Sequence, residues 1–329
     1  MPKAVVLFSG GLDSSLAVRI MQQQGWEVEA LHIRLMFDKP RGDLARCAEQ
    51  LGVPLVTMPV EDDYIEIIRR PRFGYGKAVN PCIDCRIYMC RLARRRMVET
   101  GACLVVSGEL VGQRPSSQKR RDLDLIEIYS GLEGRLLRPL SAKLLPPTIP
   151  EQEGLLDREK LYDFQGRGRG ALIELAQRLG IRHIPTPSPG CRLTDLSFAP
   201  RVRDLLQHDP QAGRPDFELL NFGRHIRLDP EHKVVLGRNA SENQAIRSLA
   251  EQYRPSRWTL LDPVDFMGPL AILIGSEMPQ AVQKAAELVA RYGDCPALGT
   301  VRVFQPGRQD QQILSVCKPA ADTPLPRPC

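Results

Sequence analysis

The sequence predicts an α/β fold with a doubly wound, mostly parallel sheet, followed by a smaller α+β domain. Short apolar runs alternate with amphipathic segments through residues 1–205, and helical segments between strands are the connections that parallel strands need. Residues 206–329 change character, because short strand-like runs there come in closely spaced pairs. A chain of 329 residues is long enough for two domains, and we divide it at residues 205 and 206.

The first strand runs into a turn that is suited to phosphate. Residues 4–8 are continuously apolar, as in a strand buried on both faces of a sheet, and residues 12–21 carry apolar side chains at helical spacing. Glycines in the turn let the backbone approach a ligand, and unpaired N–H groups at a helix start attract anions. The alternative is a capped strand-to-helix turn without a ligand. The candidate nucleotide-binding residues here are Ser9, Gly10, Gly11, Asp13, Ser14 and Ser15.

Four further apolar runs predict the rest of the parallel sheet: residues 28–33, 55–60, 103–107 and 136–140. Ligands of such sheets bind beyond the carboxyl ends of the strands. This rule makes His32 and Ile33 candidates for adenine contacts, with ordinary packing as the alternative. It also places Gly108 near the nucleotide and Glu109 near the reacting centre. Arg138 or Lys143, at the end of the last of these runs, is a candidate for phosphate contacts.

Three cysteines form a second group of candidate residues. Cys82 and Cys85 stand at the start of a predicted helix beside Arg86, where we expect lowered thiol pKa values. Cys191 follows the proline-spaced segment 185–190. The spacing alone is compatible with half of a zinc site, a redox pair or part of an iron–sulfur site.

The composition argues against a membrane-spanning protein and against a disulfide-stabilised one. No apolar run approaches the roughly 20 residues of a membrane span, so we expect a cytoplasmic protein without membrane contact. Nine cysteines at irregular spacing in such a chain indicate metal, cluster or sulfur chemistry more than a disulfide framework.

Basic residues lie among aromatic ones in segment 64–77, and the net charge is +6. Cations beside aromatic rings bind phosphates and stack on bases, although a charged run is also typical of a plain solvated face. The candidate RNA contacts of this segment are Arg69, Arg70, Arg72 and Lys77. Residues 165–170, Gln-Gly-Arg-Gly-Arg-Gly, precede a predicted helix at 170–179, and they are compatible with an anion site or with a solvated loop.

The C-terminal part predicts a small sheet with two helices. Strands are expected at residues 222–228, 233–239, 300–304 and 312–316, with an apolar run at 270–275. Helical periodicity covers residues 241–253 and 280–292.

The motif S-G-G-L-D-S resembles the PP-loop of the ATP pyrophosphatases, an adenine nucleotide alpha hydrolase-like fold. Together with N-P-C-I-D-C-R, S-G-E, G-Q-R-P-S-S-Q, R-P-L-S-A-K and P-G-C-R-L-T-D, it extends the resemblance to the tRNA thiolation enzymes over residues 1–205. The resemblance implies ATP, with Asp13 holding Mg²⁺ or nucleotide. It also implies that Cys82, Cys85 and Cys191 bind a [4Fe–4S] cluster, with a persulfide or disulfide pair and zinc as alternatives.

Two strand-like stretches, G-R-H-I-R-L and V-V-L-G-R-N, resemble the small RNA-binding module of NFACT-type proteins. That resemblance implies RNA contacts by Arg224, His225, Arg227, Lys233 and Arg238, which are otherwise ordinary surface charges.

The two resemblances lead us to expect an ATP-dependent tRNA sulfurtransferase, in which a base carbonyl is adenylated and its oxygen replaced by sulfur. The expected catalytic residues are Asp13, Cys82, Cys85, Cys191 and Glu109. Expected partners are tRNA, a sulfur donor (sulfide or a persulfide-carrying protein) and a second copy of the chain in a homodimer. The alternatives are a PP-loop enzyme that adenylates a non-RNA substrate, and an RNA-binding protein with a regulatory nucleotide site.

Overall fold

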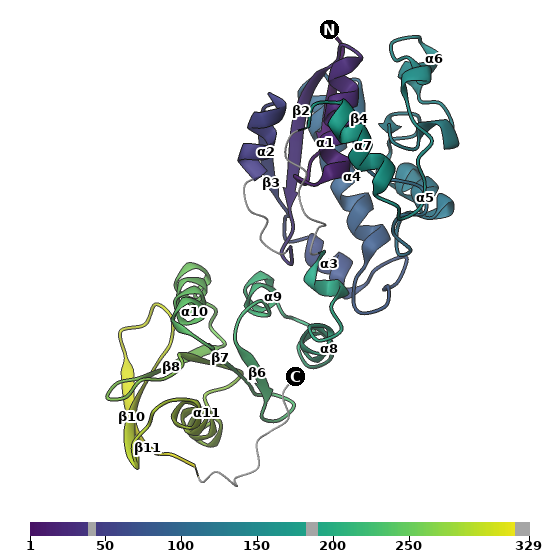
Figure 1. Cartoon of the computed structure of the whole chain (residues 1–329). Helices are drawn as coiled ribbons and strands as arrows, with labels where there is room; N and C mark the ends of the chain where they lie inside the picture. The colour runs from purple at the N-terminus through teal and green to yellow at the C-terminus, as the bar shows by residue number, and fades with distance from the viewer. Residues whose placement is uncertain (39–43, 182–189, 320–329) are drawn as a thin grey trace. The chain divides into compact units, whose positions relative to one another are not determined.

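The chain forms two units, residues 1–196 and 197–329, in a computed structural model that describes residues 1–38, 44–181 and 190–319 (Figure 1). The expected assignment of residues 1–205 and 206–329 to two functional domains stays a prediction. No helix in the three described ranges is long and apolar enough to cross a membrane.

The first unit contains a sheet of five strands in the order β3-β2-β1-β4-β5, and all neighbouring strands are parallel. This arrangement confirms the predicted fold class. The strands are β1 (Lys3–Leu7), β2 (Glu27–Arg34), β3 (Leu55–Pro59), β4 (Leu104–Ser107) and β5 (Leu136–Leu137). Successive strands leave β1 first on one side and then on the other, so the strand order reverses between β1 and β4.

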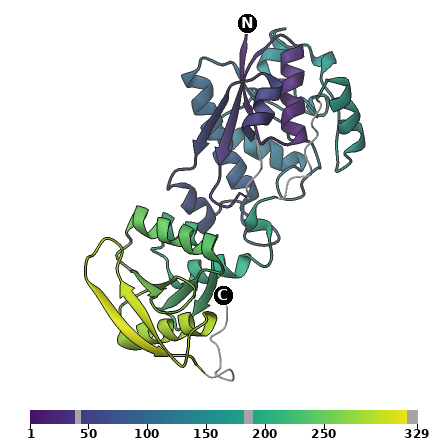
Figure 2. The same ribbon diagram turned by 60° about the vertical axis from the view of Figure 1, so that its left-hand side comes forward.

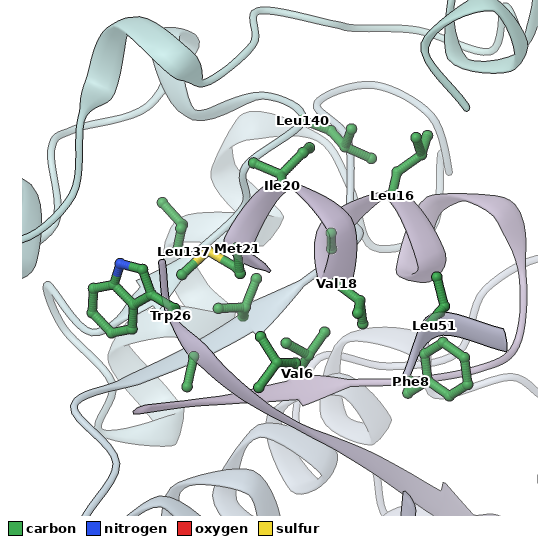
Figure 3. Packing of buried hydrophobic residues seen from close by; sticks show 14 of the residues in the cluster. Val6, Phe8, Leu16, Val18, Ile20, Met21, Trp26, Leu51, Leu137 and Leu140 are labelled. Atoms are coloured by element: carbon green, nitrogen blue, oxygen red, sulfur yellow. The ribbon is translucent and has the colours of Figure 1, made fainter. Parts of the chain in front are cut away.

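Helices cover both faces of this sheet. The helices are α1 (Leu12–Gln23), α2 (Leu44–Leu51), α3 (Tyr64–Arg69), α4 (Cys82–Glu99), α5 (Arg120–Ser130), α6 (Ile149–Gln152) and α7 (Gly170–Arg178), with short 3-10 turns η1 (Ala142–Leu144), η2 (Arg158–Lys160) and η3 (Arg192–Thr194). Val6 of β1 and Phe8, which directly follows β1, pack with Leu16 and Ile20 of α1 in one apolar cluster (Figure 3). The alternate residue Val5 is equally buried and points to the opposite face, and α4 contacts the same central strands.

The predicted fifth strand is shorter than expected. Pairing with β4 stops at Leu137, and the next side chain, Arg138, enters a buried group of charges instead of continuing the ladder. Leu140 lies in the apolar cluster on the α1 side of the sheet. The apolar pattern of residues 136–140 therefore reflects the burial of this whole stretch, and only its first two residues form a strand.

The second unit is an antiparallel sheet of six strands in the order β11-β10-β8-β9-β7-β6. Its strands are β6 (Arg224–Arg227), β7 (Lys233–Leu236), β8 (Trp258–Pro263), β9 (Ala271–Ile274), β10 (Leu298–Phe304) and β11 (Gln311–Cys317), and its helices are α8 (Ala199–His208), α9 (Arg214–Leu219), α10 (Ala240–Tyr253) and α11 (Pro279–Tyr292). The β10–β11 hairpin is the long yellow pair of strands in Figure 2. Strand β8 lies inside the sheet, between β10 and β9, and was not predicted from the sequence.

Alternate residues of β8 and β9 separate the core of the second unit into two layers. Leu261 and Leu273 pack with α11 in one cluster, whereas Leu260 and Ile272 pack with α10 in the other. Trp258 lies in the α10 layer and donates a hydrogen bond from Nε1 to Asp216 at 3.0 Å.

Candidate functional site

A cleft with a volume of about 380 Å³ lies beyond the carboxyl ends of β1, β2 and β4 in the first unit. The strand order reverses between β1 and β4, and open parallel sheets bind their ligands at such a point. The cleft gathers residues from six separate segments of the chain. The predicted site residues that line it are Ser9, Asp13, Ser14, His32, Ile33, Cys82, Cys85, Gly108, Glu109 and Cys191.

The turn between β1 and α1, residues 9–15, is called the phosphate loop below. Gly10 has a φ of +68°, a left-handed conformation that glycine adopts without strain. The hydroxyls of Ser14 and Ser15 donate to the carbonyl of Gly11 at 2.9 and 3.0 Å, and the N–H of Ser9 donates to Ser14 Oγ at 3.3 Å. Ser14 therefore joins both ends of the loop. Gly10, Gly11 and Ser15 shape the loop but are not among the residues that line the cleft.

Gly108 brings the end of β4 into direct contact with the phosphate loop. A Cβ atom at this position would lie 2.5 Å from the carbonyl carbon and oxygen of Asp13 and 2.7 Å from the backbone nitrogen of Ser14. These are backbone atoms, which cannot rotate away as a side chain does. Glycine is required here because two backbones approach each other closely.

Asp13 is surrounded by polar groups that sequence analysis did not assign. Burial raises the pKa of its carboxyl above the usual value, and a hydrogen bond from Gln113 Nε2 at 3.1 Å opposes that shift. The guanidinium groups of Arg169 and Arg114 oppose it as well. The polar run after β4, Gly112 to Gln118, was the available signal, because it follows the carboxyl end of a strand.

His32 connects β2 to the start of the phosphate loop. Its Nδ1 lies 3.1 Å from the carbonyl oxygen of Phe8. A carbonyl can only accept, so Nδ1 carries the proton and donates. Ile33 is buried and follows His32 along the same strand.

The three predicted cysteines lie around the same cleft, at its α3 and α4 side. The Asn80 amide donates to Cys82 Sγ at 3.1 Å, and the buried Tyr64 hydroxyl donates to Cys85 Sγ at 3.2 Å. Cys191 pairs with Asp38 in an isolated antiparallel bridge. Residues 185–189, which were expected to shape the loop before Cys191, lie outside the described residues.

The expectation of lowered thiol pKa values is wrong for two of these cysteines. Burial raises the pKa of Cys85 to about 11, and the hydrogen bond from Tyr64 and the charge of Arg86 only partly oppose it. Burial also raises the pKa of Cys191 to about 12. The helix start and the neighbouring cation do not compensate for lost hydration, so both thiols are protonated at neutral pH in the protein alone.

Glu109 belongs to a buried group of charges at the end of β4. Arg86 Nε lies 3.4 Å from Oε1, while Arg138 Nε and the Ser107 hydroxyl donate to Oε2 at 3.3 and 3.2 Å. Burial alone would raise the pKa of Glu109, but Arg86 and then Arg138 outweigh it, and the pKa is lowered. Glu109 is thus an ionised partner of Arg86, the residue after Cys85. Arg138 is also buried and bonded to Glu127 at 3.2 Å, so the expectation that it faces phosphates is wrong.

The donor set at the cleft fits an iron–sulfur cluster chemically. Three cysteine thiols line one cavity, two of the sulfurs accept hydrogen bonds, and cysteine sulfur is the usual ligand of iron in such clusters. Within residues 1–38, 44–181 and 190–319, no three or more His, Cys, Asp and Glu side chains are grouped so that they could hold a single metal ion.

The basic segment of the first unit combines exposed cations with aromatic rings. The Arg72 guanidinium lies 4.3 Å from the centre of the Tyr129 ring and donates to its hydroxyl at 3.2 Å. The backbone N–H groups of Arg72 and Phe73 donate to the Asp84 carboxylate at 3.0 and 3.1 Å, which ties the segment to the first turn of α4. Arg70 and Lys77 are exposed, whereas Arg69 pairs with Glu66.

The predicted RNA contacts of the second unit differ in exposure. Arg224 is exposed and lies 5.0 Å from the centre of the Tyr292 ring, and Arg238 is paired with Glu242. Arg227 donates two hydrogen bonds to the Asp204 carboxylate, at 3.0 and 2.8 Å. His225 and Lys233 are both only 2 % exposed, so the expectation that they are surface contacts is wrong.

Comparison with known proteins gives matches to both units. A family model described as the tRNA methyl transferase HUP domain matches residues 2–125, and one described as the NFACT protein RNA binding domain matches residues 223–325. A tRNA-specific 2-thiouridylase MnmA of Methylobacterium sp. (strain 4-46) is 30% identical over 327 residues, which cover 83% of this chain and 80% of that protein.

Two other relatives are similar over shorter stretches. A tRNA-specific 2-thiouridylase MnmA of Trichlorobacter lovleyi is 32% identical over 121 residues, 34% of each chain. A "Probable tRNA sulfurtransferase" of Methanobrevibacter smithii is 30% identical over 173 residues, 49% of this chain and 43% of that one. The chain thus spans less than half the length of these two curated relatives.

Proposed function

Because the chain belongs to the family of the tRNA-specific 2-thiouridylases, we propose that it is an ATP-dependent tRNA sulfurtransferase. One observation carries this proposal: the phosphate loop and all three cysteines line a single cleft. A base carbonyl oxygen attacks the α-phosphorus of ATP, and pyrophosphate leaves with the electrons of the broken bond. Hydrosulfide then forms a bond to the base carbon and loses its proton, and AMP leaves with the former carbonyl oxygen and the electron pair of the broken carbon–oxygen bond.

The activating half of the site is the phosphate loop with the ends of β2 and β4. Ser9 to Ser14 bind phosphate through backbone N–H groups and hydroxyls, and Asp13 holds Mg²⁺. His32 and Ile33 contact adenine, and Gly108 allows the nucleotide to lie against the loop. The work of these groups is positioning and neutralisation of charge, which dominate phosphoryl transfer.

The sulfur-delivering half is the cysteine triad, Cys82, Cys85 and Cys191, for which we propose a [4Fe–4S] cluster. When bound, such a cluster supplies an iron with an open position for sulfide. Tyr64 and Asn80 orient two of the sulfurs, and ligation removes the thiol protons that burial otherwise retains. Glu109 holds Arg86 beside the triad. The sulfur donor is sulfide, or a persulfide-carrying protein together with a two-electron reductant such as a thiol, which releases the outer sulfur as sulfide.

RNA binding is proposed for both units. In the first unit, Arg70, Arg72 and Lys77 offer exposed cations, and the Arg72 guanidinium lies over the Tyr129 ring. In the second, the match to an RNA-binding domain and the exposed Arg224 support contacts to the tRNA backbone. The homodimer and the cytoplasmic location stay predictions.

The activating half is tested by pyrophosphate release from ATP in the presence of bulk tRNA. We expect Asp13→Asn to abolish release, while the exposed Asp163→Asn serves as the matched control and keeps wild-type rates. Pyrophosphate release that does not depend on the presence of RNA would favour a small-molecule substrate. RNA binding without any release of pyrophosphate would favour an RNA-binding protein with a regulatory nucleotide.

The sulfur half is tested by iron and acid-labile sulfide content after anaerobic purification. We expect about four of each per chain in the wild type and loss of both in Cys82→Ser. Cys317→Ser is the control, because that thiol is exposed on the second unit. Stoichiometric zinc in a colourless protein would contradict the cluster.

A further inference from the structure

A serine, a histidine and an aspartate are joined by hydrogen bonds in the second unit. Nε2 of His232 lies 2.9 Å from the hydroxyl of Ser276, and Nδ1 of His232 lies 2.9 Å from both carboxylate oxygens of Asp229. A carboxylate can only accept, so in the neutral ring Nδ1 carries the proton and Nε2 accepts from the Ser276 hydroxyl. In this order of contacts a carboxylate orients a histidine and the histidine activates a serine.

The turn between β6 and β7 holds the aspartate and the histidine in place. The Asp229 carboxylate also accepts the backbone N–H groups of Glu231 and His232, both at 2.9 Å. The N–H of Leu228 donates to the carbonyl of His232 at 2.9 Å, which closes the hairpin. The His232 side chain is only 4 % exposed, so packing fixes its ring as well as the two hydrogen bonds.

Gly275 brings the serine to the histidine from the neighbouring strand. It directly follows β9, which pairs with β7 in the sheet. Its φ is +129°, and a Cβ atom there would lie 2.6 Å from the carbonyl oxygen of Glu231 and 2.9 Å from Cδ2 of His232. A residue without a side chain is required at this approach, and the next residue, Ser276, therefore emerges beside the ring.

Ser276 is exposed, whereas the histidine behind it is buried. A substrate can thus reach the hydroxyl from solvent without displacing its partner. The backbone N–H groups of Ser276 and Glu277 have no acceptor within residues 1–38, 44–181 and 190–319, and α11 begins at Pro279, so the positive end of its dipole lies next to them. N–H groups of a nucleophilic serine and of the residue after it stabilise the oxyanion in known serine hydrolases.

We propose that Asp229, His232 and Ser276 form a second catalytic site, which hydrolyses small carboxylic esters. The Ser276 oxygen bonds to the ester carbonyl carbon, its proton passes to Nε2 of His232, and the π electrons of the carbonyl move onto its oxygen. When this electron pair returns, the bond to the alcohol oxygen breaks, and the alcohol leaves with the proton from Nε2. Water then attacks the acyl group on Ser276 by the same two steps, which release the carboxylic acid and restore the serine hydroxyl. Asp229 is a positioning residue that holds the ring in the required tautomer.

The second site is separate from the proposed thiolation site, because all of its residues belong to the second unit. The residue after Ser276, Glu277, lines a cavity of about 450 Å³ that also has Val282, Val303 and Leu314 in its walls. This cavity offers an apolar place for the acyl part of an ester. Hydrolysis needs no reactant other than the ester and water.

The test is labelling of the full chain by a fluorophosphonate, whose phosphorus bonds to an activated serine oxygen as fluoride leaves. Mass spectrometry locates the label, which we expect on Ser276 in the wild type. Asp229→Asn should slow this labelling by about a hundredfold or more, the contribution of a correctly oriented general base. The asparagine oxygen can still accept backbone N–H groups of the turn, so we expect this variant to stay folded. Hydrolysis of p-nitrophenyl acetate in excess of that by Ser276→Ala should fall in parallel.

Ser256→Ala is the matched control, because Ser256 is exposed in the same unit and has no hydrogen bond to a histidine among the described residues. Absence of label from Ser276 in the folded wild type would overturn the second site. Equal labelling rates of the wild type and Asp229→Asn, both shown to be folded by urea unfolding, would overturn it too, because the three residues would then be a structural contact. Neither ATP nor tRNA is present in this test, so its failure leaves the proposed function intact.

Discussion

The substitution Gly108→Ala tests whether the close approach of β4 to the phosphate loop positions the nucleotide. In Gly108→Ala the new Cβ would lie 2.5 Å from the carbonyl group of Asp13, whereas ordinary contacts begin at 3.4 Å. The loop and the end of β4 must therefore move apart by nearly 1 Å. Overpacking of this kind costs about 1–3 kcal/mol of unfolding free energy. A displacement of about 1 Å in a site that works by positioning lowers its rate by about a hundredfold.

The assay measures pyrophosphate release from ATP together with urea unfolding. We expect Gly108→Ala to stay folded, with a modest loss of stability and a loss of about a hundredfold in rate. Gly213→Ala is the control, because its nearest neighbour would be Pro215 Cδ at 3.6 Å and its φ of −102° suits alanine. If Gly108→Ala releases pyrophosphate at the wild-type rate, the close approach of the two backbones does not position the nucleotide and the reasoning is refuted.

Three further predictions follow from charge and burial. In the cluster-free protein, mass spectrometry can follow the rate at which iodoacetamide alkylates Cys85 and Cys191. This rate should rise about tenfold per pH unit up to the pKa values of about 11 and about 12. A plateau of the rate near pH 8.5 would contradict the effect of burial on these pKa values. Hydrogen bonds from Arg227 and the buried Lys233 outweigh burial and hold the pKa of Asp204 below its usual value. The ionised carboxylate therefore stabilises the folded state fully above about pH 4, and this stabilisation is lost as the pH falls through the folded-state pKa. Asp204→Asn should cost about 3 kcal/mol in urea unfolding at pH 7 and less at pH 3, and an equal cost at both would count against this ion group. Arg224→Ala should weaken tRNA binding and reduce the slope of log affinity against log salt by about 1, and an unchanged slope would remove it from the interface.

The sequence predictions that agree with the structure rest mostly on patterns of neighbouring residues. The phosphate loop could be found because strand, glycines and helix follow one another within a few residues. The grouping of the three cysteines was implied by the family resemblance alone, since Cys191 is far from Cys85 in the chain. The raised pKa values of Cys85 and Cys191 were missed because loss of hydration depends on tertiary packing, which no local pattern records.

Other features depend on which side of an element faces the core. His225 and Lys233 carry polar side chains on short strands, and sequence alone did not reveal that both are buried. The interactions of Gln113 and Arg169 with Asp13 join three distant segments, so neither residue could be linked to the phosphate loop by spacing. Strand β8 was missed because Asp262 and Pro263 end a short apolar run whose pairing partners lie elsewhere in the chain.

The central claim, that ATP activation and sulfur delivery on tRNA occur in one cleft, is tested most directly by nucleoside analysis of cellular tRNA. Mass spectrometry would compare cells with the gene, cells without it, and deletion cells that carry wild type, Asp13→Asn or Cys85→Ser. The account predicts that one thiolated nucleoside disappears in the deletion, returns with the wild-type gene, and returns with neither variant. An unchanged set of thiolated nucleosides in the deletion, in cells that express the wild-type gene, would contradict it.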